Sequence, residues 1–172
     1  MAQRSQHKIR TRFLENIHLI TAAGGLFLAL DTGRVCLQQR SQHTSHPKTW
    51  AFWGGKAEPK ERPIETLLRE FEEEIGSLPD VQKIHPLHIF KSKNNQFEYH
   101  TFIVAVYEEF IPILNNESDG YCWVKIGNWP RPLHPGSKNI LYEKRISKKI
   151  GTIYNRHKDN TNGPNWIASL YS

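Results

Sequence analysis

The chain has 172 residues, of which 38% are hydrophobic and 23% charged, and its formal net charge is +6 at pH 7. This length suits one domain with a core of its own, and this composition is ordinary for a globular protein in water. No apolar run approaches the roughly eighteen residues that a membrane span needs, and the basic start lacks the apolar centre of a secretory signal. With Cys36 and Cys122 as its two cysteines, the sequence predicts free thiols in a reducing compartment, and therefore a cytoplasmic protein.

The excess positive charge is concentrated near the two ends of the chain. A net positive charge favours anionic partners such as nucleotides or nucleic acid. No base-stacking motif of the RRM or cold-shock kind accompanies these residues, so a solvated surface is preferred to RNA binding. The basic residues in question are Arg4, Lys8, Arg10, Arg12, Lys138, Lys144, Arg145, Lys148, Lys149, Arg156 and Lys158.

The first half of the chain predicts a polar basic extension over residues 1–17 and then three strands. Residues 18–30 are apolar and contain Gly24-Gly25, which indicates a bulge or a close backbone approach. A turn at residues 31–33 returns the chain into a second strand over residues 34–39. After a polar loop, residues 49–53 form a short strand that leads into Gly54-Gly55.

The next element is a helix from Pro63 to Ile75. Proline is favoured at the first helical position, and Gly76 can take the left-handed conformation that ends a helix. The helical period gathers an apolar stripe that should face the core. Its members are Ile64, Leu67, Leu68, Phe71 and Ile75.

The second half predicts one or two strands over residues 80–93, interrupted at Pro86, and further strands over residues 97–110 and 120–126. Residues 139–150 have helical periodicity. The tail over residues 154–172 should pack back through Trp166, Ile167 and Leu170. Strands alternating with two helices indicate an α/β or α+β sandwich in a single domain.

Acidic side chains gather on one side of the predicted helix. Glu70, Glu73 and Glu74 fall within about a third of its circumference. Like charges at this spacing repel by roughly a few tenths of a kcal/mol per pair, and a multivalent cation would neutralise them. Oxygen ligands alone favour a hard ion, Mg²⁺ or Mn²⁺, over zinc. The alternative is a solvated acidic face, which is the usual role of a charge run.

The whole segment resembles the Nudix box. The match is Gly55-x5-Glu61-x7-Arg69-Glu70-Phe71-x-Glu73-Glu74-x-Gly76, and it fails only at the last position, where Ser77 replaces an aliphatic residue. So many fixed positions make a chance match improbable. The resemblance implies a Nudix-type α/β/α sandwich with a mixed sheet between helices over residues 18–153.

The resemblance also implies roles for the box residues. Members of the family split a diphosphate linkage X–P–P–Y by attack of water on phosphorus, helped by divalent ions. Glu73 and Glu74 would be metal ligands together with the Gly54 carbonyl, and Glu70 a ligand or the water-activating base. Glu61 would be structural, and Arg69 would orient the ligands by pairing with Glu73 or Glu65. Gly55 and Gly76 occupy fixed positions of the box.

A further acidic ligand is expected from a later loop. Glu117 precedes Trp123 by six residues, which is similar to the placement of an acidic ligand in MutT-like hydrolases. The sequence therefore indicates Glu117 as a metal ligand or catalytic residue. Asp119 is the first alternative, followed by Glu98 and Glu108.

Substrate contacts are predicted in the same way. Arg40 and Lys56 are placed like phosphate-binding residues of MutT-like proteins, although either could be an ordinary surface charge. Asn139 resembles an asparagine that bonds a purine edge, and helix capping is its alternative role. Trp53, with Trp50 and Phe52, could stack on a base or belong to the core; the family often has proline where Trp53 stands.

These features lead to three functional hypotheses. The first is a Mg²⁺- or Mn²⁺-dependent hydrolase that converts a nucleoside triphosphate to monophosphate and pyrophosphate. The second is hydrolysis of ADP-ribose, a dinucleoside polyphosphate or another X–P–P–Y compound. The third is a Nudix-like regulator that binds a nucleotide or RNA without turnover. The resemblance also allows a homodimer, because many members of the family form one.

Overall fold

The structure is a computed structural model that describes residues 19–159. The predicted N-terminal extension, and the part of the predicted tail beyond residue 159, lie outside these residues. The elements in chain order are β1 (Ile20–Ala29), β2 (Arg34–Arg40), β3 (Trp50–Ala51), β4 (Trp53–Lys56), α2 (Pro63–Ile75), β5 (Val81–Lys91), β6 (Phe97–Val106), β7 (Ser118–Lys125), α3 (Pro135–Leu141) and α4 (Lys144–His157).

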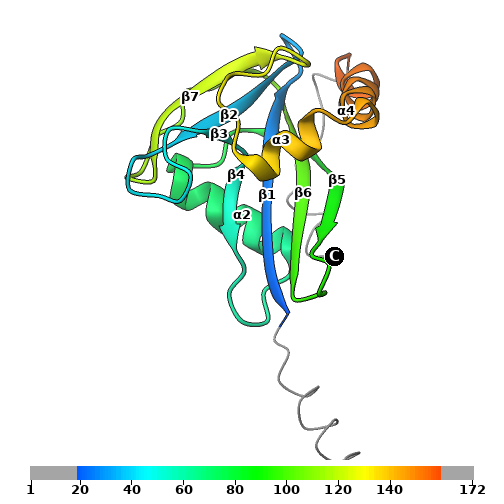
Figure 1. Ribbon diagram of the computed structural model, residues 1–172. Coiled ribbons are helices and arrows are strands. Elements are labelled where there is room, and N and C mark those ends of the chain that lie inside the picture. Colours follow the sequence, from blue (N-terminus) through cyan, green and yellow to red (C-terminus); the bar gives the residue numbers. More distant parts are fainter. Residues whose placement is uncertain (1–18, 160–172) are drawn as a thin grey trace, which may run out of the picture.

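A mixed sheet forms the middle of the molecule, as the family resemblance implied. Its strand order is β3-β2-β1-β6-β5, with β4 paired to β1 and β7 paired to β2. Strands β1 and β6 run parallel, and the other pairs are antiparallel. Strand β1 therefore contacts three other strands and lies at the centre of the sheet (Figure 1).

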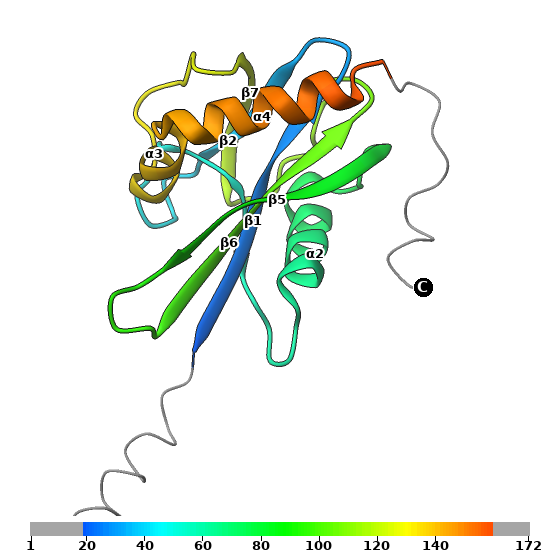
Figure 2. The ribbon, with the colours of Figure 1, turned by 90° about the vertical axis from the view of Figure 1, so that its right-hand side faces the viewer.

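The two faces of the sheet carry separate apolar cores. Along β1, Leu26 and Leu28 belong to one core, and Phe27 and Ala29 belong to the other, as the period of two in a strand requires. Helix α2 covers the second face, and helices α3 and α4 cover the first (Figure 2). This arrangement is the predicted α/β/α sandwich.

Helix α2 has the bounds that the sequence predicted. Pro63 is its first residue, and the Arg62 backbone N–H donates to the Glu65 carboxylate at 2.8 Å. Gly76 ends the helix with φ of 79°, in the region that favours glycine. Leu67 and Phe71 are fully buried, so the apolar stripe faces the sheet.

The Gly24-Gly25 pair marks a close backbone approach. A Cβ atom on Gly24 would lie 2.4 Å from the Trp53 carbonyl oxygen of β4 and 2.0 Å from the Tyr99 hydroxyl. The pairing of β1 with β4 and with β6 continues through Gly24 without a register shift. Close approach, and not a bulge, is therefore the reason for glycine here.

The C-terminal helical region differs from the prediction. It consists of two helices, α3 and α4, and α3 begins at Pro135, before the predicted start at residue 139. His134 caps α3 by accepting a hydrogen bond from the Gly136 N–H at 3.2 Å. Asn139 lies inside α3, so the capping role considered for it is wrong. Helix α4 continues to His157, beyond the predicted domain boundary at residue 153.

The structure also defines the bounds of two predicted strands. Strand β6 ends at Val106, four residues before its predicted end, and Phe110 instead packs its ring edge on Phe27 at a centroid distance of 4.9 Å. Of the one or two strands predicted over residues 80–93, the structure has one, β5, whose register against β6 shifts between Val81 and Lys83 and between Pro86 and His88. Within residues 19–159, no helix is long and apolar enough to span a membrane.

Helix α4 meets strand β5 at a pair of histidines. The rings of His85 and His157 lie 4.9 Å apart, and within the described part of the chain neither Nε2 atom has a hydrogen-bond partner. Burial, and then the neighbouring His157 and Lys83, lower the pKa of His85 to about 4. The contact between α4 and β5 is therefore built around neutral imidazoles.

Replacing His85 with asparagine should reduce the loss of stability on acidification. The unfolded chain protonates His85 near pH 6.5 and the folded chain only near pH 4, so the free energy of unfolding falls as pH falls through this window and is unaffected above it. We expect the variant to lose about 1 kcal/mol less than wild type between pH 7.5 and pH 5. Urea denaturation at both values measures this, with the exposed His43→Asn variant as the control. Equal losses in all three proteins would contradict the assignment.

Candidate active site

The loop before α2 is tied to the helix by Glu61. Its Oε1 atom accepts a hydrogen bond from Arg69 Nε at 2.9 Å, and its Oε2 atom accepts from the Thr66 hydroxyl at 2.8 Å and from the Glu58 N–H at 2.9 Å. These bonds, the one from Arg69 first, lower the pKa of Glu61 to about 2. Glu61 is thus an ionised anchor of the loop.

Arg69 connects this anchor to the acidic side of the helix. Its Nη1 atom lies 2.9 Å from Glu70 and 3.3 Å from Glu73, and its Nη2 atom donates to the Lys56 carbonyl at 3.0 Å. Glu65, the other partner considered for Arg69, pairs with Arg62 at 2.8 Å instead. One guanidinium therefore fixes two of the predicted ligand side chains relative to strand β4.

Glu74 is the most enclosed carboxylate of the helix, with 2% of its surface exposed. Its Oε1 atom accepts from Gln38 Nε2 at 2.8 Å, and its Oε2 atom accepts from the Gly54 N–H at 2.7 Å. Burial, and to a smaller extent the charges of Glu70 and Glu117, raise the pKa of Glu74 to about 8 against the effect of these bonds. Gly54 therefore contacts this carboxylate through its N–H and not through the carbonyl that was predicted as a metal ligand.

Glu70 lies directly over Gly55. A Cβ atom on Gly55 would meet all three atoms of the Glu70 carboxylate at 2.5 to 2.6 Å. The absence of a side chain at this position therefore makes room for the carboxylate against the strand. Burial raises the pKa of Glu70 above its usual range, although Arg69 opposes this. Two acidic side chains of α2 thus meet two successive glycines of β4.

The donor set fits a hard divalent cation. Glu70 and Glu74 are forced together with raised pKa values, and nearby Glu117 adds a like charge to both. A divalent cation would relieve this repulsion, and carboxylate oxygens are the ligands that Mg²⁺ and Mn²⁺ prefer. In residues 19–159, no three acidic, histidine or cysteine side chains are already arranged around a common metal position.

The acidic residues of the later loop are in different surroundings. Glu117 is exposed, and its charge raises the pKa values of Glu70 and Glu74. The Asp119 carboxylate instead pairs with Lys48 at 2.5 Å, and Glu98 pairs with Lys91 at 2.5 Å. We call Glu70 and Glu74 the acidic cluster. Of the three later acidic residues, Glu117 is the one whose charge raises the pKa values of both.

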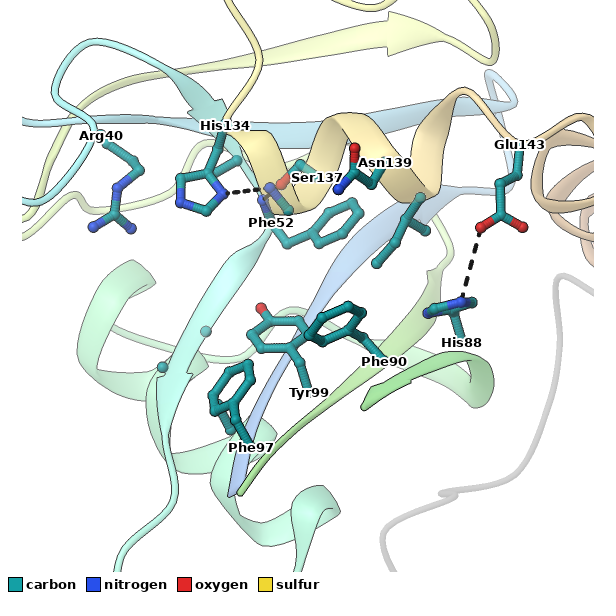
Figure 3. Close-up of a pocket in the computed structure, with 16 residues that line it drawn as sticks. Arg40, Phe52, His88, Phe90, Phe97, Tyr99, His134, Ser137, Asn139 and Glu143 are labelled. Atoms are coloured by element: carbon teal, nitrogen blue, oxygen red, sulfur yellow. Dashed lines mark hydrogen bonds and ion pairs between the residues drawn. The ribbon is translucent and has the colours of Figure 1, made fainter. Parts of the chain in front are cut away.

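A cavity of about 470 Å³ opens beside the two glycines, between the sheet and helix α3 (Figure 3). Arg40 and Asn139 line it, as do Gly54 and Gly55. Arg40 is held by hydrogen bonds to Ser45, with Nε donating to the carbonyl at 2.7 Å. Arg40, the predicted phosphate contact, and Asn139, the predicted base contact, therefore line the same cavity as the two glycines of β4.

Two other predicted substrate contacts lie elsewhere. Trp53 is completely buried in the core below α2, edge-on to Phe27 at a centroid distance of 6.3 Å, so it is a core residue and cannot stack on a base. Its neighbour Phe52 points to the other face and lines the cavity. Lys56 is exposed and lies outside the cavity wall, with its carbonyl bound by Arg69.

Sequence reasoning missed several residues of the site. Gln38, which donates to Glu74, lies in a buried strand. A polar side chain in such a strand was a signal that it binds another buried polar group. Aromatic side chains of the cavity wall lie two positions apart on β5 and likewise on β6. This period of two was the signal that they lie on the same face of the sheet. The residues missed in the cavity are His88, Phe90, Phe97, Tyr99, His134 and Glu143.

Comparisons with known proteins identify the family of this chain. The family model of the NUDIX domain matches residues 19–143. The nucleoside triphosphatase NudI of Escherichia fergusonii is 29% identical over 117 residues, covering 60% of this chain and 77% of that protein. The CTP pyrophosphohydrolase of Escherichia coli (strain K12) is 41% identical over 44 residues, which is 26% of this chain and 33% of that protein.

The fold is likewise shared with solved structures. A Nudix hydrolase from M. smegmatis, RenU, superposes with a TM-score of 0.62 at 24% identity, covering 79% of this chain and 87% of that chain. At this identity the likeness concerns the fold, and the match of the family model over most of the described residues establishes the relationship. The chain belongs to the Nudix hydrolase family.

Proposed function

We propose that the protein hydrolyses a nucleoside triphosphate to the nucleoside monophosphate and pyrophosphate, with Mg²⁺ or Mn²⁺ as its cofactor. The observation that supports this most directly is the double role of Gly54-Gly55. The two glycines meet the Glu74 and Glu70 carboxylates and also line the cavity that contains Arg40. A substrate in this cavity would bring its phosphates beside the acidic cluster.

The side chains have distinct tasks in this reaction. A bound divalent cation supplies positive charge for the phosphates and lowers the pKa of the attacking water. Glu73, Glu74 and Glu117, with the Gly54 carbonyl, are the proposed ligands, and Arg40 faces the phosphates. Glu70 is the proposed base that accepts a proton from water, because burial raises its pKa and a raised pKa makes its carboxylate a stronger base. The water oxygen bonds to phosphorus as the bridging P–O bond breaks.

A substrate panel tests the proposal. Purified protein with Mg²⁺ should release pyrophosphate from at least one nucleoside triphosphate, and a chelator should abolish the activity. ADP-ribose and dinucleoside polyphosphates belong in the panel, because hydrolysis of either in place of every triphosphate would reassign the substrate class. Binding of nucleotides without any turnover would refute hydrolysis and indicate a regulator.

Replacing Glu117 with glutamine should lower kcat at limiting Mg²⁺ by about tenfold to a hundredfold, because the site loses one of its acidic ligands. The Mg²⁺ concentration for half-maximal rate should rise in the same variant. Asp119→Asn is the matched control, since Asp119 is two residues away and already paired with Lys48. If the control loses activity and the Glu117 variant does not, Asp119 and not Glu117 is the acidic ligand.

A further inference from the structure

The cavity has two chemically different ends (Figure 3). Arg40 and His134 lie at one end, and His88 and Glu143 lie at the other. The first end carries an arginine and belongs to the proposed phosphate side. The second end carries a carboxylate that the proposed reaction does not use. The site therefore contains an acidic group well placed to meet the part of the substrate farthest from its phosphates.

The Glu143 carboxylate is held from outside the cavity. Its Oε2 atom accepts a hydrogen bond from Arg145, a largely exposed side chain. This bond lowers the pKa of Glu143, so the group is ionised at neutral pH. Its Oε1 atom lies 3.9 Å from His88 Nε2, which is beyond hydrogen-bond distance. Among the residues that the structure describes, no other donor reaches this Oε1 atom, so it is left to accept a bond from a ligand.

His88 strengthens the polar character of this end. Its Nδ1 atom is buried and, within residues 19–159, has no hydrogen-bond partner. Buried polar atoms normally find a partner in the protein, in water or in a ligand. The His88 atom that is paired with Glu143 is Nε2, so a polar ligand group that contacts the carboxylate would lie beside this nitrogen, while the buried Nδ1 adds a second polar atom at the same end of the cavity.

Flat apolar surfaces lead from one end to the other. Phe90 and Phe97 present rings 6.3 Å apart from neighbouring strands, and Tyr99 continues the same wall. Helix α3 closes the opposite side through Ile140 and Asn139. Aromatic and apolar walls of this kind bind planar rings by stacking. A nucleobase would fill the space with one polar edge directed at Glu143.

We propose that Glu143, supported by His88, selects nucleobases that carry an exocyclic amino group over those that carry a carbonyl at the same position. This inference rests on the proposed function, because it takes the ligand to be a nucleotide. An amino group donates to the free carboxylate oxygen, whereas a carbonyl oxygen would face it as a second acceptor and be repelled. The substrate class is therefore an amino-bearing nucleoside triphosphate, of the cytosine, adenine or guanine type.

Matched nucleotide pairs test this selection. CTP and UTP differ by an amino group and a carbonyl at one ring position, and so do ATP and ITP, and GTP and XTP. For the pair that contains the best substrate, we expect kcat/KM to favour the amino-bearing member by about tenfold or more, the usual effect of one hydrogen bond to a charged group. A best substrate that lacks the amino group, or a ratio within twofold of one, would overturn the proposal.

The Glu143→Gln variant assigns the selection to this residue. A glutamine amide can either accept or donate, so the ratio within each pair should fall to within about threefold of one. Most of the change should appear in KM, because the acidic cluster is untouched. The exposed Asp80→Asn variant removes one charge outside the cavity and should keep the wild-type ratio. A Glu143→Gln variant that is folded, by its thermal transition, and keeps the wild-type ratio would refute the role.

Binding separates this inference from the proposed function. Affinities for CMP against UMP, and for AMP against IMP, can be measured by calorimetry without metal and without turnover. If no triphosphate is hydrolysed but the amino-bearing monophosphate of a pair binds about tenfold more tightly, the proposed function fails and the inference stands. If triphosphates are hydrolysed with no preference within the pairs, the inference fails and the function stands.

Discussion

Replacing Glu74 with glutamine should lower kcat by about three orders of magnitude or more, a loss typical of removing a central catalytic group. The change keeps the size of the side chain but removes the charge that a divalent cation would bind. Both carboxylate oxygens now accept hydrogen bonds, from Gln38 and from Gly54. A glutamine can accept only at one oxygen, so its amide nitrogen would face a donor. Because burial raises the pKa of Glu74 to about 8, this position already holds an uncharged side chain near neutral pH, and the variant should fold.

The measurement is kcat at saturating Mg²⁺, together with the thermal midpoint of both proteins. Glu72→Gln is the matched control, because Glu72 lies on the same helix, is exposed, and occupies a variable position of the box. The control should retain wild-type turnover. Near-normal turnover by a folded Glu74→Gln variant would remove Glu74 from the proposed set of ligands.

Replacing Gly54 with alanine should cost about 3 kcal/mol or more of unfolding free energy, since it combines backbone strain with a backbone clash. Gly54 has φ of 131°, a conformation that residues with a side chain rarely adopt. The new Cβ would lie 2.2 Å from the Ala23 carbonyl oxygen and 2.4 Å from Gly24 Cα. Both obstacles are backbone atoms of the central strand and cannot rotate away.

Chemical denaturation measures this loss, and Gly151→Ala is its control. Gly151 lies inside α4, and a Cβ atom there would meet nothing within 4 Å. That substitution should stabilise the protein by roughly 0.5 to 1 kcal/mol, because alanine is the better helix former. A Gly54→Ala variant as stable as wild type would show that β4 can move away from β1, contrary to the contacts described above.

Much of the acidic site could be predicted from sequence because its parts are local. The helix period places Arg69 one turn before Glu73, and the two are in contact. Pro63 and Gly76 fix the two ends of the helix through their backbone preferences. Glu61, in the loop just before the helix, needs only a short chain to reach Arg69. Local geometry of this kind depends little on the rest of the fold.

The cavity could not be predicted, because its wall depends on contacts between distant segments. Glu143 meets His88 across 55 positions of sequence, and Gln38 meets Glu74 across 36. The strand period shows that Phe52 and Trp53 point to opposite faces, but it does not tell which face is filled by the core and which is left open. The break between α3 and α4 was hidden because apolar residues of both helices together imitate one helical period.

Gln38 has a consequence for how the protein responds to its ligands. One amide nitrogen donates both to the Phe52 carbonyl, at 3.0 Å, and to the Glu74 carboxylate, at 2.8 Å, while its oxygen accepts from Ser118. A nucleotide that displaces Phe52 would therefore change the hydrogen bond from Gln38 to the proposed ligand Glu74. A cation that binds Glu74 would likewise change the hydrogen bond from Gln38 to Phe52. Because such linkage is reciprocal, the factor by which the nucleotide changes cation affinity should equal the factor by which the cation changes nucleotide affinity, and selection for a new base should alter the ion requirement.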